Sequence, residues 1–143
     1  VQGILIEILY PMFAVISLSG ISFLFLSATR VPFIIKHFGN LQAGKHSEEL
    51  RPHLDSFGRN ITDNYNHLFE QPTVFYALVL YIHLIQHTDT MHVYLAWSYA
   101  LLRIMHSLIQ ITSNNVSFRF LIFSGSGLCL IAMIIKEALF FLS

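Results

Sequence analysis

Charged residues are scarce in this sequence. Asp, Glu, Lys and Arg make up 11% of the 143 residues, whereas hydrophobic residues make up 55%. A soluble domain normally carries about twice that charged fraction, which argues against an ordinary soluble domain. The formal net charge is zero, so the basic surface that nucleic-acid binding requires is lacking and we expect no nucleic-acid partner. The single cysteine, Cys129, excludes a disulfide within the chain and hence a disulfide-stapled secreted domain.

Long runs without a charged residue decide the class of protein. They cover residues 8–29, 71–86, 90–102 and 120–135. A helix needs about 20 mainly apolar residues to cross the hydrocarbon core of a bilayer. The runs therefore predict an all-α integral membrane protein in which residues 1–143 form a single four-helix bundle domain. The expected helices cover about residues 5–30, 65–87, 91–113 and 117–141. The first run is too long for a cleaved signal peptide and lacks a basic segment before it.

Positive charges are distributed unevenly between the connections. Five of the eight Lys and Arg residues lie between positions 30 and 64, and none lies around residues 87–90. Because cytoplasmic loops are enriched in Lys and Arg, we expect the polar loop 31–64 and the Arg119 end of the last helix to be cytoplasmic. Both termini then lie on the opposite side, and membrane lipids surround the helices. Ser47, followed by two acidic residues, predicts one short helix in the loop.

Four polar residues interrupt the apolar stretch of the expected third helix. They are Arg103, His106, Ser107 and Gln110, and their spacing puts all four within a narrow sector of the helix surface. A polar stripe is costly where it faces lipid, so we expect it to face the interior of the bundle.

A second polar stripe begins the expected second helix, where Asp63, His67 and Glu70 share a face. Glu70 stands at the cytoplasmic boundary of the hydrocarbon, whereas Arg103 lies roughly 18 Å from the outer end of its helix at about 1.5 Å per residue. An unpaired charge at that depth costs at least about 2.5–3.5 kcal/mol. We therefore predict an ion pair between Glu70 and Arg103. Such a pair has either a functional role or the simpler role of fixing the helix register.

The order and spacing of these residues resemble the MAPEG superfamily, the membrane-associated proteins of eicosanoid and glutathione metabolism. The resemblance covers most of helices two to four. It is carried by His67-Leu-Phe-Glu70-Gln-Pro72, by Phe75-Tyr76, by Trp97-x-Tyr99-x3-Arg103-x2-His106-Ser107 and by Asn115-x3-Arg119. The opening Tyr10-Pro11 and the loop Arg30 suit the bacterial members.

The resemblance implies a homotrimer whose sites lie between subunits near the cytoplasmic face. It implies glutathione as cofactor and a lipophilic small molecule that arrives from the bilayer. Arg119 matches the arginine that lies beside the glutathione thiol, which makes it the candidate catalytic residue. The residues expected to bind the tripeptide are His67, Glu70, Arg103, His106, Gln110 and Asn115. The implied activity is that of a glutathione-dependent transferase, peroxidase or isomerase.

Four positions depart from the family pattern. Asp63 and Asn115 stand where arginines are usual, His67 stands for an asparagine, and Gln110 stands for a tyrosine near the thiol. The expected crevice is therefore two to three charges more negative, although a protonated His67 or a loop arginine (Arg51 or Arg59) could offset part of this. The departures also fit a second function, a non-catalytic lipid-binding or scaffolding trimer, since the superfamily includes a member, the lipoxygenase-activating protein, that binds lipid and performs no chemistry.

Three histidines lie close together at the outer end of the second and third helices. His83, His87 and His92 could hold zinc or copper through their imidazoles. Histidines also suit the membrane boundary without any ligand, and three histidines near a tight turn are weak evidence for a metal site. The favoured interpretation is therefore interfacial histidines and no metal site.

Overall fold

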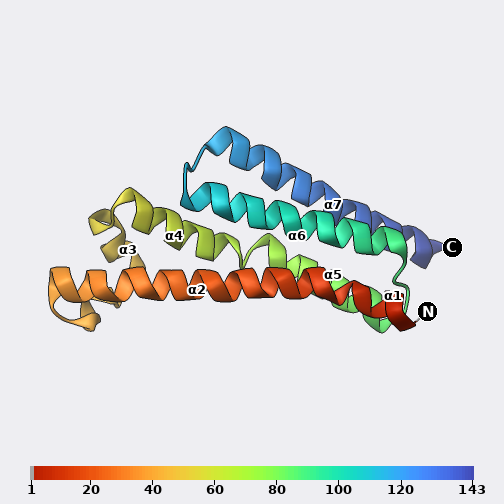
Figure 1. Cartoon of the computed structure of the whole chain (residues 1–143), viewed down its shortest axis with the longest axis horizontal. Coiled ribbons are helices and arrows are strands. Elements are labelled where there is room, and N and C mark those ends of the chain that lie inside the picture. The colour runs from red at the N-terminus through yellow and green to blue at the C-terminus, as the bar shows by residue number, and fades with distance from the viewer. Residues whose placement is uncertain (1) are drawn as a thin grey trace.

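The computed structural model describes residues 2–143, and helices account for nearly all of them (Figure 1). In chain order the elements are α1 (Gln2–Glu7), α2 (Leu9–Phe38), η1 (Leu41–Gly44), α3 (Ser47–Leu50), η2 (Arg51–His53), α4 (Ser56–His67), α5 (Gln71–Leu84), α6 (Thr90–Ile111) and α7 (Val116–Leu142). Residues 2–143 contain no strand, so the predicted all-α class is confirmed.

The first membrane helix is longer than predicted. α2 continues past Arg30 to Phe38, and Pro32 lies inside it. It ends at Gly39, whose φ of 70° is the left-handed conformation that favours glycine, and whose N–H donates to the carbonyl of Ile35. The predicted end near residue 30 is therefore wrong, because a single arginine does not terminate a helix whereas a left-handed C-cap does.

The predicted second helix is divided in two. α4 ends at His67 and α5 begins at Gln71, with Pro72 in its first turn. A proline has no N–H for the carbonyl four residues earlier, and its ring clashes with that carbonyl, here Leu68. The chain therefore breaks at residues 68–70 and starts a new helix. α4 also reaches into the predicted loop, since the Asp55 carboxylate caps it by accepting from the N–H of Gly58 at 2.7 Å.

The helices pack side by side along one long axis (Figure 1). α2 runs beside α4 and α5, α6 packs against α2 and α4, and α7 forms an antiparallel hairpin with α6. The described N-terminal residues and the C-terminus lie at the same end, opposite α3. The apolar core lies between these helices and includes Val15, Phe75, Ala96, Tyr99 and Met133, all fully buried.

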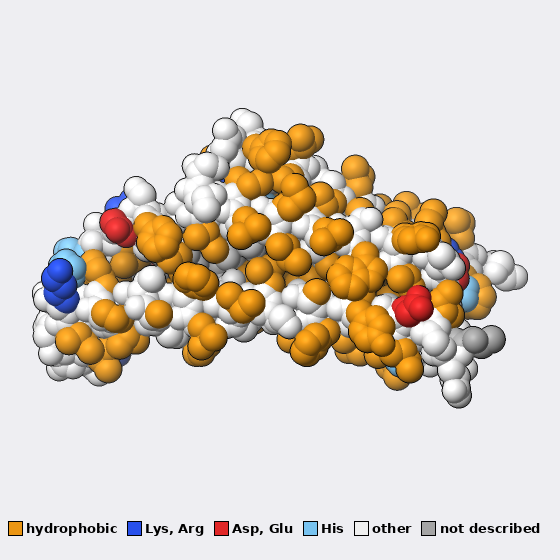
Figure 2. Space-filling view, viewed as in Figure 1, with side chains coloured by type: hydrophobic (Ala, Val, Ile, Leu, Met, Phe, Trp, Pro, Cys, Tyr) orange, Lys and Arg blue, Asp and Glu red, His pale blue; other side chains and the backbone are white. Residues whose placement is uncertain are grey.

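The outer surface is also apolar. Figure 2 shows hydrophobic side chains over the length of one face, with charged side chains towards the two ends. Exposed examples are Phe13, Leu24, Leu84, Leu121 and Phe141. Two helical stretches, Gln2–Phe38 and Val116–Leu142, are long and apolar enough to cross a membrane. An apolar exterior of this extent fits a lipid environment rather than water.

Candidate functional site: a polar cavity between α4–α7

The polar stripe of α6 faces the bundle interior, as its spacing predicts. Arg103, His106, Ser107 and Gln110 are each at most 3% exposed. Three buried atoms of this stripe have no hydrogen-bond partner within residues 2–143, namely Nε of Arg103, Nδ1 of His106 and Oγ of Ser107. Buried polar atoms are usually paired, so this stripe retains unused hydrogen-bonding capacity.

Arg103 binds the break between α4 and α5 rather than the acid beside it. Its Nη2 donates to the backbone carbonyl of His67 at 3.2 Å. No ion pair joins Glu70 and Arg103 in the part of the chain that the structure describes, so the predicted direct pair is wrong. The broken helix explains the difference, because Glu70 lies in the break and its side chain is exposed. Both residues nevertheless line the same cavity.

His67 and Gln110 form a pair between α4 and α6. Nδ1 of His67 lies 2.9 Å from Nε2 and 3.2 Å from Oε1 of the Gln110 amide, so the amide can serve this nitrogen as donor or as acceptor, according to the tautomer of His67. The ring of His67 also lies 6.2 Å, centroid to centroid, from that of His106. Gln110 is fully buried, so its amide fixes the orientation of His67 beside the cavity.

Arg119 is positioned by two asparagines at the start of α7. Asn115 is the N-cap of the helix, and its side-chain oxygen accepts from the N–H of Phe118 at 3.0 Å. Asn114 accepts a hydrogen bond from Nη1 of Arg119 and donates to Oδ1 of Asn60. The sequence interpretation missed Asn114. Its φ of 47° is one that asparagine tolerates better than most residues, and the Asn114-Asn115 pair before an apolar run was the available signal.

A cavity of about 220 Å³ is lined by polar groups from α4, from the break between α4 and α5, from α6 and from α7. Its polar lining consists of His67, Glu70, Arg103, His106 and Arg119, and its apolar lining consists of Val116, Phe120 and Phe123. Five of the seven predicted site residues therefore meet at one place. Gln110 contacts the cavity through His67, and Asn115 acts as a helix cap instead of lining it. The three apolar residues were not predicted as part of the site, because an apolar residue in a membrane helix carries no signal that separates lipid contact from cavity wall.

The family model described as MAPEG family matches residues 8–139, nearly the whole chain. The protein belongs to the MAPEG family. The sequence resemblance is thereby confirmed, and with it an integral membrane protein. Neither the search of curated proteins nor the search of solved structures yields a match to this chain.

The MAPEG chain compensates the unusual acid at position 63 within its own loop. Nη1 and Nη2 of Arg51 donate to the two carboxylate oxygens of Asp63 at 2.7 and 3.1 Å. This two-pronged hydrogen bond holds the pKa of Asp63 below its ordinary value and raises the pKa of Arg51. One of the two arginines suggested by the sequence therefore pairs with the acid at position 63, although neither side chain lines the cavity. The other, Arg59, donates through Nε to the carbonyl of Leu54 at 3.2 Å.

Proposed function

We propose that this MAPEG protein binds glutathione in the cavity between α4, α5, α6 and α7 and transfers it to a lipophilic electrophile. The observation that carries the proposal is the convergence of two arginines, one glutamate and two histidines on a single cavity with an apolar wall. Arginines bind carboxylates and thiolates well, and the apolar wall suits a lipophilic partner.

The charges of the cavity complement those of the tripeptide. Glutathione carries two carboxylates, one ammonium group and, once ionised, a thiolate, and the cavity offers Arg103, Arg119 and Glu70 to three of these four groups. We assign Glu70 to the ammonium group and Arg103 to a carboxylate, since guanidinium and carboxylate form strong charge-assisted hydrogen bonds. His67, His106 and Gln110 complete the polar contacts, and Asn115 contributes by fixing the first turn of α7. The unpartnered atoms of Arg103, His106 and Ser107 support a polar ligand at this place.

Arg119 is the proposed catalytic residue. A free thiol has a pKa near about 8.5, so only a few per cent is ionised at neutral pH. A guanidinium in the first turn of a helix adds two positive potentials, its own charge and the helix dipole, and both favour the thiolate. The thiolate sulfur forms a bond to carbon of the electrophile as the leaving group departs with the bonding electrons. Asn114 keeps the guanidinium oriented towards this position.

The proposal includes an arrangement in the membrane. Residues 1–143 act as one four-helix membrane domain, and by the positive-inside rule the α3 end with its arginines and lysines faces the cytoplasm while both termini lie opposite. Three copies form a homotrimer, as the family resemblance implies, and the neighbouring subunit covers part of the cavity mouth. The lipophilic substrate enters from the bilayer past Phe120 and Phe123.

One observation favours a second candidate function, a non-catalytic lipid-binding or scaffolding trimer. Gln110, in place of the usual tyrosine, is fully buried and bonded to His67, so this position offers no phenol near the thiol. Mass spectrometry of lipids retained by the purified protein separates the two candidates. A bound acyl ligand without any response to glutathione favours the second.

The test of the proposal is conjugation of glutathione to the lipophilic electrophile chlorodinitrobenzene by the detergent-solubilised protein. Arg119→Ala should lower the rate by about 100- to 1,000-fold, the usual effect of removing one stabilising donor. Arg119→Lys should retain part of the rate because it keeps the charge. Arg59→Ala, which changes an arginine of α4 outside the cavity, is the matched control. Equal rates in wild type and Arg119→Ala would contradict the proposed role.

A further inference from the structure

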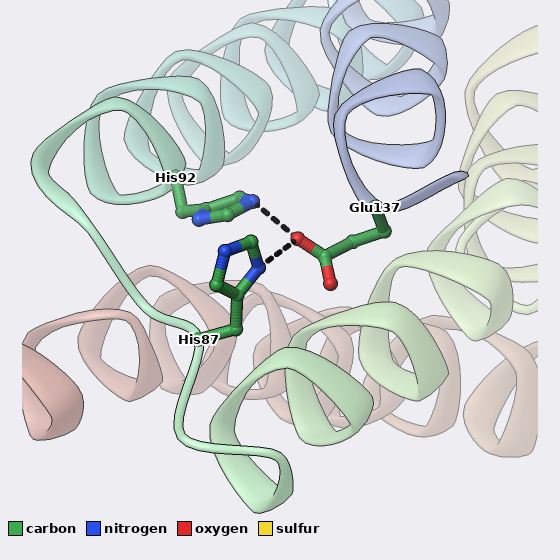
Figure 3. A group of neighbouring side chains, drawn as sticks. All are labelled: His87, His92 and Glu137. Atoms are coloured by element: carbon green, nitrogen blue, oxygen red, sulfur yellow. Dashed lines mark hydrogen bonds and ion pairs between the residues drawn. The ribbon is translucent and has the colours of Figure 1, made fainter. Parts of the chain in front are cut away.

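A second polar cluster lies at the end of the molecule that carries the termini. His87 comes from the connection between α5 and α6, His92 from the first turn of α6, and Glu137 from the last turns of α7 (Figure 3). His92 and Glu137 are buried, at 0% and 6% exposure. At about 1.5 Å per residue, His92 lies roughly 16 Å along α6 from Arg103, so this cluster is separate from the proposed glutathione site.

The donor atoms of these three side chains converge on one point. Oε1 of Glu137 lies 2.8 Å from Nδ1 of His87 and 2.9 Å from Nε2 of His92 (Figure 3). One ligand atom from each residue lies within 4.8 Å of the others. Zn–N bonds of about 2.05 Å in a tetrahedral site imply about 3.3 Å between ligand atoms. Small rotations of the side chains would reach that spacing.

Hydrogen bonding alone leaves this cluster incomplete. His92 Nε2 approaches the carboxylate, yet it has no partner with hydrogen-bond geometry within residues 2–143. Oε2 of Glu137 likewise has none. A buried nitrogen and a buried carboxylate oxygen without partners require an explanation, and a bound cation provides one for both.

Neighbouring side chains hold the cluster in an orientation suited to an ion. The Asp89 backbone N–H donates to Nδ1 of His92 at 3.4 Å, and Oδ1 of Asp89, the N-cap of α6, lies 3.0 Å from the same nitrogen. These contacts hold the His92 ring with Nε2 beside Glu137. Coordination of an ion by Nε2 requires the ring proton on Nδ1, where the Asp89 carboxylate would accept it. Lys136 pairs with Asp89 and so offsets its charge. The ring of His87 stacks on Phe140, with centroids 3.7 Å apart.

We propose that His87, His92 and Glu137 bind one divalent transition-metal ion, for which zinc is the best match. Two imidazoles and one carboxylate are borderline-hard ligands that zinc accepts, and a set of three leaves one position for water. The bound ion links the α5–α6 connection and the start of α6 to the end of α7. The ion therefore stabilises the hairpin of α6 and α7 at the end opposite α3.

The structure thus revises the sequence interpretation, which favoured interfacial histidines because three histidines near a tight turn are weak evidence for a metal site. Glu137 supplies an acid from a position 50 residues along the chain from His87. His83, the third histidine of the sequence hypothesis, is not part of the cluster. Its Nδ1 lies 2.8 Å from the backbone carbonyl of Leu5.

The test uses the full chain in detergent, purified with an affinity tag that contains no histidine. A chelator first removes any bound metal, and the protein is then titrated with zinc chloride. Elemental analysis after desalting should give one zinc per chain, and zinc should raise the melting temperature reversibly. Glu137→Gln preserves the size of the side chain but removes its charge. We expect it to weaken zinc binding at least about 100-fold, since even outer-shell changes weaken metal sites by 10- to 100-fold. His83→Gln is the matched control and should bind zinc as wild type does.

Cobalt provides a readout that does not depend on the folding of a variant. Titration of the wild-type protein with Co²⁺ should produce the intense visible bands of four-coordinate cobalt, and zinc should abolish them. Absence of zinc after desalting together with no such bands would overturn the proposal and leave a hydrogen-bonded cluster only. Undiminished zinc binding by a folded Glu137→Gln variant would also overturn it.

Discussion

Replacing Arg103 with methionine separates a functional role of the α6 stripe from a structural one. Arg103 is 1% exposed, donates one hydrogen bond to the carbonyl of His67 and leaves Nε unpartnered. The carbonyl of His67 also accepts from the N–H of Glu70, so it keeps a partner when the guanidinium is removed. Methionine preserves much of the apolar stem and its volume.

Two opposing terms determine the change in the free energy of unfolding. Loss of one hydrogen bond from a charged donor costs about 1.5–3 kcal/mol. Removal of a guanidinium from deep in a membrane helix returns at least about 2.5–3.5 kcal/mol on insertion scales. Together the two terms change the free energy of unfolding by about −0.5 to +2 kcal/mol, where a positive value means that the methionine variant is more stable. Arg103→Met should therefore fold as well as wild type or slightly better when no ligand is bound.

Binding should respond in the opposite direction. If Arg103 pairs with a glutathione carboxylate, its loss removes about 1.5–3 kcal/mol of binding free energy, which raises the Kd for glutathione by about 10- to 150-fold. Unfolding in mixed micelles measures the first quantity, and isothermal titration with glutathione measures the second. A loss of stability above about 3 kcal/mol with unchanged glutathione affinity would refute the reasoning, because that pattern belongs to a purely structural buried charge.

Three further changes test the packing, the loop and the catalytic arginine. Phe75→Ala, in the fully buried core, should lower the free energy of unfolding by about 3–5 kcal/mol in the same unfolding assay, and a change below about 1 kcal/mol would contradict the assigned core. The hydrogen bond from Arg51 holds the pKa of Asp63 below its ordinary value of 3.8, so this pair stabilises the fold above pH 3.8 and the stabilisation is lost as the pH falls through the lower, folded-state pKa. Asp63→Asn should flatten that part of a plot of melting temperature against pH, and an unchanged slope would argue against the pair. Asn114→Gly permits the positive φ at this position but removes the amide that orients Arg119. It should lower the conjugation rate by about tenfold, the equivalent of one charge-assisted hydrogen bond. A rate equal to that of wild type would show that Arg119 needs no such support.

Periodicity in the sequence was sufficient to predict the α6 stripe. Arg103, His106, Ser107 and Gln110 lie on one face of any regular helix, and the cost of a charge in lipid turns that face inwards. The same reasoning found Glu70 and His67, which do lie beside the stripe at the cavity. Local rules of this kind predict correctly where a helix is regular and where it is known whether lipid or water surrounds it.

The remaining features depend on backbone detail or on distant contacts. The break that Pro72 causes in the second helix follows from a local rule that the sequence alone supports. Because Glu70 lies in this break, the predicted pair between Glu70 and Arg103 does not form. The contact between Arg51 and Asp63 depends on how the loop folds, which charge pattern alone does not determine. The contact of Glu137 with His87 joins α7 to the connection between α5 and α6, which is distant in sequence, and no spacing rule links them.

Whether the polar cavity of α4–α7 is a glutathione site is tested by the melting temperature of the detergent-solubilised protein with and without reduced glutathione. A ligand that binds only the folded state raises the melting temperature as its concentration exceeds the Kd. We expect a concentration-dependent increase in the melting temperature at millimolar glutathione, which Arg103→Met should reduce and which free cysteine should not produce. No change in the wild-type melting temperature at millimolar glutathione would contradict the claim.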